Sequence, residues 1–581
     1  MSAFRPIVAV ALGLCLLSPV QGRADEDAGA YLAARIAGTD NDFREAANWY
    51  TRALISDPNN ATLMEGAVTA QLAAGNLEAA IAVAKRMQAG GGKITQAAQL
   101  ALMADQAQRG DFAAMLADIK AGRSIGKLMD QLAGAWAELG LGKMSEAADG
   151  FDKLAATAGL ESFGLYHKAL ALASVGDFEG ADDILSGRAK GKFGVLRRGV
   201  IAHAQILSQL ERDPDALQVL DAAFPGTTDP EIVALRARLA AGETIPWDMA
   251  KNATDGIAEV FFTLAIALNG DAEDSYTLLY ARIASSIRAD HVEALLLSAG
   301  LLEGLNQFDL AVETYARIKP EDGEYFVAEI GRARALQSAG RTEAALEVLQ
   351  TLSRSHPDLT AVQVALGDAM RREERWQEAV AAYDAAIALI GAPKPDDWSL
   401  YYSRAIANER LDHWDKAEPD FRQALALNPD QPQVLNYLGY SYIEKNTNLD
   451  EALKMIEQAV AASPDSGYIV DSLAWGLFHL GRYGEAIQPM ERASLLEPVD
   501  PVVTDHLGDV YWAVGRQMEA RFQWRRALSF SPDEKDAARI RQKLDTGLDA
   551  VLSAEGAPSL QEVADGSKSP IVGNVPPENG N

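Results

Sequence analysis

Apolar residues recur at helical spacing along most of the chain, and the clearest case is the stretch 501–534. Between residues 502 and 514 the apolar positions lie three and four apart, which predicts an amphipathic helix. A Gly-Arg pair at 515–516 interrupts this run, and a second helical stretch covers residues 518–528. The pattern predicts two antiparallel helices joined by a tight turn.

The same pattern stands 34 positions earlier, in residues 467–500, where eight positions agree in residue class at equal offsets. In the later stretch these are Leu507, Gly508, Tyr511, Gly515, Ala520, Trp524, Ala527 and Pro532, and in the earlier one Leu473, Ala474, Leu477, Gly481, Ala486, Met490, Ala493 and Pro498. A 34-residue period with small residues where two helices approach resembles the tetratricopeptide repeat (TPR). The resemblance implies an all-α fold, a right-handed superhelical solenoid of helical hairpins.

A small residue near the start of each second helix marks the repeats along the chain. It recurs as Ala46, Ala80, Ala147, Ala181 and Ala216, and later as Ala311, Ala345, Ala379, Ala417, Ala452, Ala486 and Ala520. We therefore expect loose N-terminal repeats over residues 25–230 and a regular array over 292–534, about thirteen hairpins in all. Residues 231–291 do not follow the 34-residue period. We interpret them as an irregular joint between two superhelical halves with one degenerate repeat.

The two ends of the chain differ from the repeats. Residues 535–552 are amphipathic and are expected to form a capping helix for the exposed end of the stack. The tail 553–581 is rich in Gly, Pro, Ser and Asn, and we expect it to be disordered. At the other end, residues 1–24 resemble a secretory signal peptide, with Arg5 before an apolar run at 7–17.

The predicted signal peptide indicates export, and we expect the mature chain to be periplasmic. Peripheral association with the cell envelope stays open as an alternative. Cys15 is the only cysteine and lies inside the predicted signal, so the mature chain would have no disulfide. No later stretch is long and apolar enough to predict a transmembrane helix.

Composition narrows the class of partner. The formal net charge is -29, which argues against binding nucleic acid, a polyanion, and against binding anionic lipid through charge alone. Only 7% of the residues are aromatic although 48% are hydrophobic, as is typical of alanine-rich helices. The acidity favours a partner segment that is basic or neutral.

The sequence contains no convincing catalytic or metal-binding pattern. The string at 122–126 matches a nucleophile-elbow pattern around Ser124, but that motif needs a preceding buried strand, and a helical run precedes it here. The seven histidines have no metal-ligand spacing. We therefore predict no metal site, no cofactor and no enzymatic activity.

The resemblance implies that binding takes place on the concave face, where stacked first helices line a groove. In the family this groove is formed mainly by the second, fifth, ninth, twelfth and thirteenth positions of each repeat. The candidate partner-binding residues at these positions are Tyr402, Asn436, Tyr440, Tyr468, Asp471, Trp475, His479, Asp505, Asp509 and Trp512. Aromatic rings supply contact area at low entropic cost, and the polar groups would fix the register of a bound peptide.

Residues 435–528 carry a closer resemblance, in the strings LNYLGYSYIEKNTNLDEALKMIEQAV, SPDSGYIVDSLAWGLFHLGRYGEAI and DHLGDVYWAVGRQMEARFQWRRAL. They are similar to long bacterial envelope TPR proteins, including outer-membrane lipoproteins that present cell-wall hydrolases to a carboxyl-terminal processing protease. The resemblance implies a non-enzymatic scaffold or adaptor whose partners are a periplasmic protease and its substrates. Two alternatives stay open: a TPR component of envelope polysaccharide or outer-membrane assembly machinery, and a hydrolase with an unrecognised site.

Overall fold

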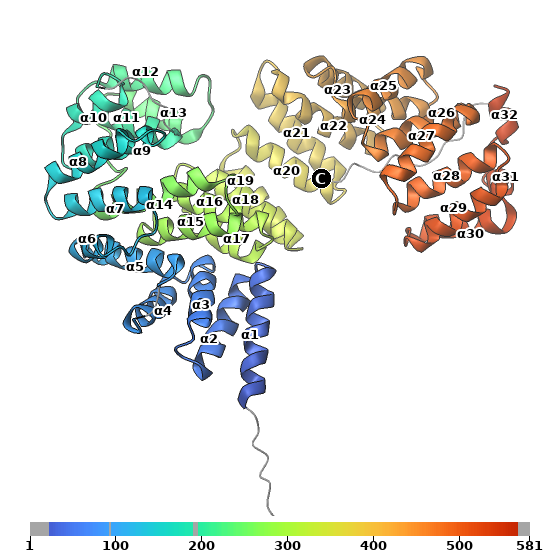
Figure 1. Cartoon of the computed structure of the whole chain (residues 1–581). Coiled ribbons are helices and arrows are strands. Elements are labelled where there is room, and N and C mark those ends of the chain that lie inside the picture. The colour runs from blue at the N-terminus through green and yellow to red at the C-terminus, as the bar shows by residue number, and fades with distance from the viewer. Residues whose placement is uncertain (1–22, 92–93, 190–195, 567–581) are drawn as a thin grey trace, which may run out of the picture. The chain divides into compact units, whose positions relative to one another are not determined.

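The computed structural model describes residues 23–91, 94–189 and 196–566. Every regular element in this part of the chain is a helix (Figure 1), so the predicted all-α class is confirmed. The chain forms two compact units, Met1–Leu352 and Ser353–Asn581.

The helices of the first unit run from α1 to α19. They are α1 (Arg23–Thr39), α2 (Phe43–Ser56), α3 (Ala61–Ala73), α4 (Leu77–Ala89), α5 (Gln96–Arg109), α6 (Phe112–Lys120), α7 (Lys127–Gly140), α8 (Met144–Ala155), α9 (Glu161–Ser174), α10 (Phe178–Leu185), α11 (Arg197–Gln209), α12 (Asp213–Ala223), α13 (Pro230–Ala240), α14 (Ala253–Leu268), α15 (Asp274–Ile287), α16 (Val292–Gly304), α17 (Phe308–Tyr315), α18 (Tyr325–Ser338) and α19 (Thr342–Ser355).

The helices of the second unit run from α20 to α32 and include one short 3-10 helix, η1. They are α20 (Thr360–Arg372), α21 (Trp376–Ile390), η1 (Pro395–Asp397), α22 (Trp398–Arg410), α23 (Trp414–Leu427), α24 (Pro432–Glu444), α25 (Leu449–Ala462), α26 (Gly467–His479), α27 (Tyr483–Leu496), α28 (Pro501–Ala513), α29 (Gln517–Ser529), α30 (Glu534–Thr546), α31 (Leu548–Ala554) and α32 (Leu560–Ala564).

Buried alanines set the spacing of the repeated hairpins, which number six from α1 to α12 and seven from α16 to α29. The alanines that marked the repeats in the sequence are at most 1% exposed: Ala46, Ala80, Ala147, Ala181, Ala216, Ala311, Ala345, Ala379, Ala417, Ala452, Ala486 and Ala520. A small side chain at this position lets the paired helices approach to the roughly 8–10 Å of ordinary helix packing. The predicted solenoid of about thirteen hairpins is therefore confirmed.

Residues 231–291 do not form the predicted joint between two halves. After α13 they contain the hairpin α14–α15, which packs back on earlier helices: α14 lies on α5, α7 and α9, and α15 on α3 and α5. Thr254 Oγ1 donates to the carbonyl oxygen of Ala107 at 3.0 Å, and Arg282 Nε donates to that of Ala73 at 3.2 Å. The boundary between the two units lies instead at Leu352 and Ser353.

The physical reason is the composition of α14, whose sequence ATDGIAEVFFTLAIAL is apolar on almost every side. A helix without a polar face is stable only when it is surrounded by other elements. The helices it contacts, α5, α7 and α9, are first helices of hairpins, as is α3 beneath α15. The surface that was expected to line a groove in this unit is thus covered by the chain itself.

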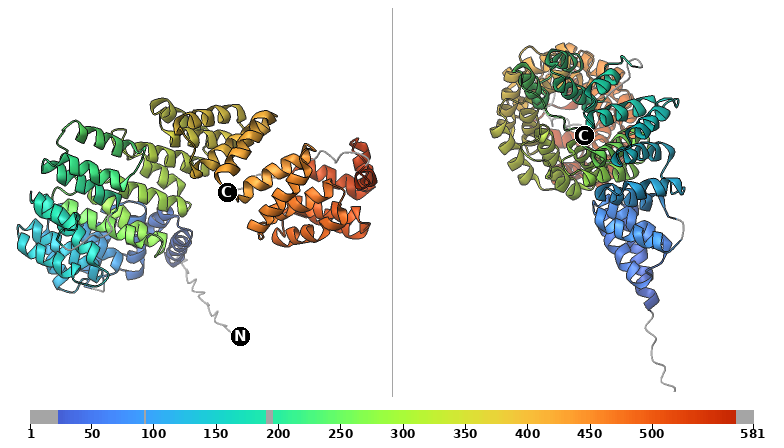
Figure 2. Two further views of the ribbon diagram at one scale, coloured as in Figure 1. Left: turned by 90° about the horizontal axis from the view of Figure 1, so that it is seen from above. Right: turned by 90° about the vertical axis from the view of Figure 1, so that its left-hand side faces the viewer.

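In the second unit, successive hairpins from α20 to α29 pack side by side (Figure 2). Close approach within a hairpin again needs a small residue: a Cβ atom on Gly508 would overlap the indole of Trp524. Trp524 is fully buried, and its Nε1 donates to Asp509 Oδ1 at 2.8 Å.

The C-terminal cap, defined as residues 534–566, differs from the single capping helix predicted for 535–552. It contains α30 and α31, which are separated at Gly547, where φ is 89°. A Cβ atom on Gly547 would lie 2.6 Å from Cζ2 of Trp512. The glycine therefore ends α30 and makes room for the indole.

The predicted disordered tail is wrong for residues 553–566. Ser559 and Glu562 form a capping box that starts α32, and Leu560 and Val563 on that helix are buried. Burial of these two side chains holds the segment on the last repeats. The rest of the tail, 567–581, and most of the predicted signal peptide, 1–22, lie outside the described residues.

Candidate functional site

A cavity of about 320 Å³ lies between the last two hairpins and the C-terminal cap. We call it the cap pocket. Its lining residues from the repeats are Trp475, Phe478, His479, Pro501, Val502, Asp505, His506, Asp509 and Pro532, and those from the cap are Lys535, Asp536, Arg539, Ile540, Leu548, Leu552 and Glu555. Seven of the sixteen lining residues thus come from the cap, so the pocket exists only because the cap folds over the last repeat.

Aromatic rings from α26 and α28 form one wall of the pocket. Trp475 is stacked between two rings, Phe478 at 4.7 Å and His506 at 3.7 Å between centroids. Both faces of the indole are therefore covered, and only its edge borders the cavity. Trp475 and Phe478 are one helical turn apart on α26, which places their rings in parallel.

An ion pair holds the imidazole of His506 in this stack. Its Nδ1 lies 3.1 Å from both carboxylate oxygens of Asp471. Burial lowers the pKa of His506, but the nearby carboxylates of Asp471, Asp505 and Asp509 raise it by more, so its net pKa is above the ordinary value. The wall accordingly favours a protonated imidazole.

Behind the wall, one cation of the cap pairs with two carboxylates of α28. The ammonium of Lys543 lies 2.6 and 2.7 Å from the oxygens of Asp505, and 2.8 and 3.0 Å from those of Asp509. Asp505 and Asp509 are four residues apart, so both point from the same side of α28. Burial still raises the pKa of Asp505, and the nearby Asp509 adds to this rise.

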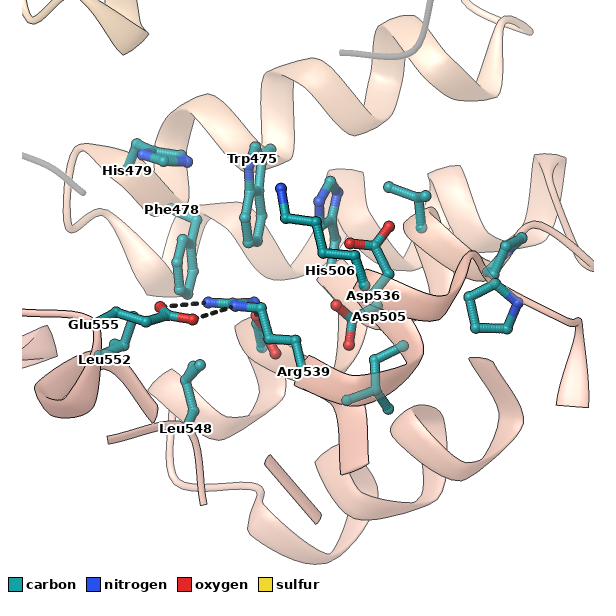
Figure 3. A pocket seen from close by; sticks show the side chains of 16 residues that line it. Trp475, Phe478, His479, Asp505, His506, Asp536, Arg539, Leu548, Leu552 and Glu555 are labelled. Atoms are coloured by element: carbon teal, nitrogen blue, oxygen red, sulfur yellow. Dashed lines mark hydrogen bonds and ion pairs between the residues drawn. The ribbon is translucent and has the colours of Figure 1, made fainter. Parts of the chain in front are cut away.

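Arg539 and Glu555 form the charged rim opposite the aromatic wall (Figure 3). Arg539 Nε donates to Glu555 at 2.8 Å, and another guanidinium nitrogen lies 3.7 Å from Asp509. Burial lowers the pKa of Arg539, but these two carboxylates raise it by more. Both side chains are partly exposed, so the rim is in contact with solvent.

The arrangement is suited to binding a partner. Ile540, Leu548 and Leu552 supply apolar surface. The charged side chains of Asp505, His506, Asp509, Arg539 and Glu555 are paired within the chain. A pocket of this kind takes an apolar side chain and orients it through a polar rim. The described residues contain no group of three or more metal-ligating side chains.

The pocket brings together four of the ten predicted binding residues, Trp475, His479, Asp505 and Asp509. Asp471 lies behind the wall as the partner of His506. The other five predicted residues do not line the cavity. Of these, Asn436 and Tyr440 are buried on α24, Tyr402 packs among aromatic rings, and Tyr468 lies next to Asp500.

Trp512 differs most clearly from its predicted role as a groove residue that binds the partner. Its Nε1 donates to Asp549 at 2.8 Å, and its ring packs against Trp524, with centroids 5.3 Å apart, and against Gly547. It therefore anchors the cap instead of facing a groove. The repeat pattern could not predict this, because the cap lies outside the repeats.

Arg539 and Glu555 line the pocket although neither is among the predicted binding residues. The sequence pattern of 535–552 predicts only an apolar face that covers the stack. The opposite side of the same helical pattern carries Arg539, and this was the one available signal that the cap also has a polar function.

Comparison with known proteins identifies the repeats. Tetratricopeptide-repeat models match residues 366–436 and residues 31–98, 330–397 and 444–495. The chain is a tetratricopeptide-repeat protein. TPR proteins generally bind other proteins or peptides. No helix in the described ranges is long and apolar enough to cross a membrane.

A TPR repeat-containing protein of Pseudomonas aeruginosa is 29% identical to this TPR protein over 205 residues. The match covers 34% of this chain and 33% of the relative, so the chain spans about one third of the length of that relative.

Several solved TPR structures are similar to the chain at low identity. The Cut9–Hcn1 complex of the APC/C is 13% identical, with 90% of this chain and 96% of that chain covered and a TM-score of 0.38. Yeast Tom70 is 13% identical, with coverages of 92% and 97% and a TM-score of 0.34. YrrB, described as a TPR protein with an unusual peptide-binding site, is 19% identical, with coverages of 33% and 92% and a TM-score of 0.26.

Proposed function

We propose that this protein is an exported, non-enzymatic scaffold that holds a segment of a partner protein in the cap pocket. The observation that carries the proposal is the pocket itself, in which Phe478, Leu548 and Leu552 border a cavity of about 320 Å³ with a charged rim. This volume accommodates one large apolar side chain and part of its neighbours. The partner segment would insert that side chain and place polar groups against Arg539 and Glu555.

The second unit is favoured over the first for this role because of α14 and α15. In the first unit these helices cover the first helices of the early repeats, so a peptide would have to displace buried chain. The cap pocket is already open and needs no such displacement. Binding to a preformed site avoids the free-energy cost of rearrangement.

The resemblance of residues 435–528 to envelope TPR proteins supports a finer assignment. In it the partners are a periplasmic carboxyl-terminal processing protease and the cell-wall hydrolases that the scaffold presents to it. The charged rim is compatible with such a role, since an exposed polar edge fixes the register of a bound segment and excludes wrong partners.

A substitution that fills the pocket without changing the buried core tests this proposal. Val502 lines the cavity and is only partly buried, so Val502→Trp should occupy the space that a partner needs. Immobilised wild-type chain and variant are incubated with envelope extract, and bound proteins are quantified by mass spectrometry. The expected result is a loss of at least about tenfold for specific partners, comparable to filling a hot-spot pocket.

The matched control is Val175→Trp, which makes the same exchange at a surface valine of the first unit. It should bind partners as the wild type does. Equal capture by Val502→Trp and wild type would refute the pocket as the binding site. Enrichment of a protease and wall hydrolases supports the adaptor assignment, whereas enrichment of synthase or barrel-assembly subunits would replace it with a role in assembly machinery.

A further inference from the structure

Four large apolar side chains project into solvent from the outer side of the last two hairpins. Leu495 and Val499 are 81% and 68% exposed, and Met518 and Phe522 are 84% and 63% exposed. Single exposed apolar residues are ordinary on a protein surface, but a group of them marks a site of contact. We call this group, together with Arg525, the α27–α29 patch.

The α29 residues of the patch lie on one exposed side of that helix. Met518, Phe522 and Arg525 follow one another at four and three residues, which places them on one side of the helix. The buried residues Ala520 and Trp524 face the opposite side, toward the interior of the repeat. The exposed side therefore takes no part in packing the solenoid.

A contact between α29 and the preceding loop joins the two halves of the patch. Arg526 donates a hydrogen bond to the carbonyl oxygen of Pro498, the residue before Val499. Leu495 lies one helical turn earlier, in the last turn of α27. Because Phe522 precedes Arg526 by one turn, its ring lies on the side of α29 that approaches this loop.

Basic side chains of α29 lie beside these apolar residues, in a chain whose net charge is -29. Arg525 makes no hydrogen bond or ion pair within the described residues. Arg521 and Arg526 donate to backbone carbonyl oxygens, and neither has a carboxylate partner in the described part of the chain. Among the acidic residues near the patch, Glu491 and Glu519 both pair with Arg516. Glu497 stands between Leu495 and Val499 in the sequence and is half-buried.

We propose that the α27–α29 patch docks on an anionic phospholipid surface. Met518, Phe522, Leu495 and Val499 enter the boundary between head groups and acyl chains, and Arg525 lies at the level of the phosphates. Apolar and basic side chains on one helix face are the combination that binds such surfaces.

Two features favour a bilayer over a protein partner. The apolar side chains protrude, whereas protein partners are usually held by side chains that enter recesses, and a bilayer accepts protruding groups anywhere on its surface. The overall negative charge does not prevent docking, because salt screens charges beyond about 8 Å, and around Phe522 the helix carries Arg521, Arg525 and Arg526. The patch faces away from the core of the repeat, so this docking is independent of the cap pocket.

The experiment is flotation of the purified chain with vesicles of phosphatidylcholine, with or without phosphatidylglycerol. We expect binding to the vesicles that contain phosphatidylglycerol, and a decrease when salt is added. Replacing Met518→Ser and Phe522→Ser together should weaken binding at least about tenfold, because both apolar groups are lost from the interface. Arg525→Gln should weaken it about fivefold, the effect of one basic residue near an anionic surface.

The matched control is the pair Leu32→Ser and Ile36→Ser, which removes two exposed apolar side chains from α1 in the first unit. This variant should float as the wild type does, and circular dichroism should be unchanged in all variants. Equal binding to both kinds of vesicle would refute the anionic-lipid assignment, as would binding that survives Met518→Ser and Phe522→Ser. Absence of vesicle binding, with partner capture from extract lost in that double variant, would instead make the patch a protein-binding surface and overturn the proposal.

Discussion

The ammonium of Lys543 lies 2.8 Å from Oδ1 of Asp509, and both side chains are buried. Lys543 belongs to the cap and Asp509 to the last repeat, so this contact joins two parts of the second unit that the repeat pattern treats separately. Asp505 shares the same ammonium. The cap is therefore held by charge as well as by the apolar residues of α30 and α31.

Removing the cation should destabilise the second unit. Lys543→Met removes the cation that Asp505 and Asp509 both contact most closely. Arg539 remains 3.7 Å from Asp509, too far to replace the ammonium, and breaking a buried pair in this way costs about 3–5 kcal/mol. Tryptophan fluorescence during urea unfolding measures the change, because six of the nine tryptophans lie at or beyond Trp376. The control Lys535→Met, at an exposed lysine of the same helix, should unfold like the wild type.

A second set of variants separates the effect of the uncompensated carboxylates from the effect of losing the packed lysine side chain. Adding Asp505→Asn and Asp509→Asn to Lys543→Met removes the uncompensated charges and should recover much of the lost stability. If Lys543→Met alone unfolds at the same urea concentration as the wild type, the ion pair is not what holds the cap.

Gly481 gives a way to detach the end of the cap. A Cβ atom there would lie 2.7 Å from Cα of Ala564, and φ is +72°. We expect Gly481→Ala to push α32 away, because backbone atoms cannot yield as a flexible side chain does. Limited proteolysis should then cut between residues 555 and 566, where we expect the wild type to resist cleavage because α32 is packed on the last repeats.

Gly515 is the matched control, since it occupies the equivalent turn of the next repeat with φ at +83° and nothing within 4 Å of a built Cβ. Both alanine variants bear the backbone strain of the left-handed region, about 1–2 kcal/mol. Only Gly481→Ala should expose the cap. Cleavage at the same rate in both variants would mean that strain, and not the contact with Ala564, decides the result.

The repeated hairpins could be predicted from the sequence, whereas the packing of α14 could not. The hairpins were predictable because alanines such as Ala486 and Ala520 repeat a local packing requirement that needs no knowledge of distant residues. The role of α14 was not predictable, because its burial depends on α5, α7 and α9, which lie far earlier in the chain. The repeat pattern alone predicts one polar face on each helix.

The candidate site was predictable only in part, for a similar reason. Trp475 and Asp505 stand at repeat positions that face inward, and this much follows from the period. Lys543, which pairs with Asp505, and Arg539, which lines the same pocket, lie in the cap, where no repeat fixes the positions. The ordered end of the chain did have a local signal, since Ser559 and Glu562 match a capping box, but the polar composition of the tail outweighed it.

The stability of the second unit should decrease as pH rises through the titration of His506. Its folded pKa is above the ordinary value of 6.5, so the folded state binds more protons than the unfolded state in that interval. The contribution is complete below pH 6.5 and is lost as pH rises through the folded pKa. His506→Gln should flatten this part of the dependence of the urea midpoint on pH, and an unchanged profile would contradict the Asp471 pairing.

Glu444 provides a separate prediction. Here too stability should decrease as pH rises, but the cause is a buried carboxyl group. This carboxyl ends α24, and burial, together with the charge of Glu409, raises its pKa to about 8. The neighbouring cations are directed at aromatic rings, Lys445 at Trp414 and Arg410 at Trp376, and offset the rise only in part.

Because the folded pKa of Glu444 exceeds its ordinary value of 4.5, stability due to this group is present below pH 4.5 and is lost as pH rises toward 8. Glu444→Gln keeps the shape and removes the charge, so it should raise the free energy of unfolding at pH 8 by about 1 kcal/mol or more, since each pKa unit corresponds to about 1.4 kcal/mol. Near pH 4.5 the same variant should differ little from the wild type. Urea unfolding at the two pH values checks this, and an equal effect at both would show that Glu444 is not titrating in a buried site.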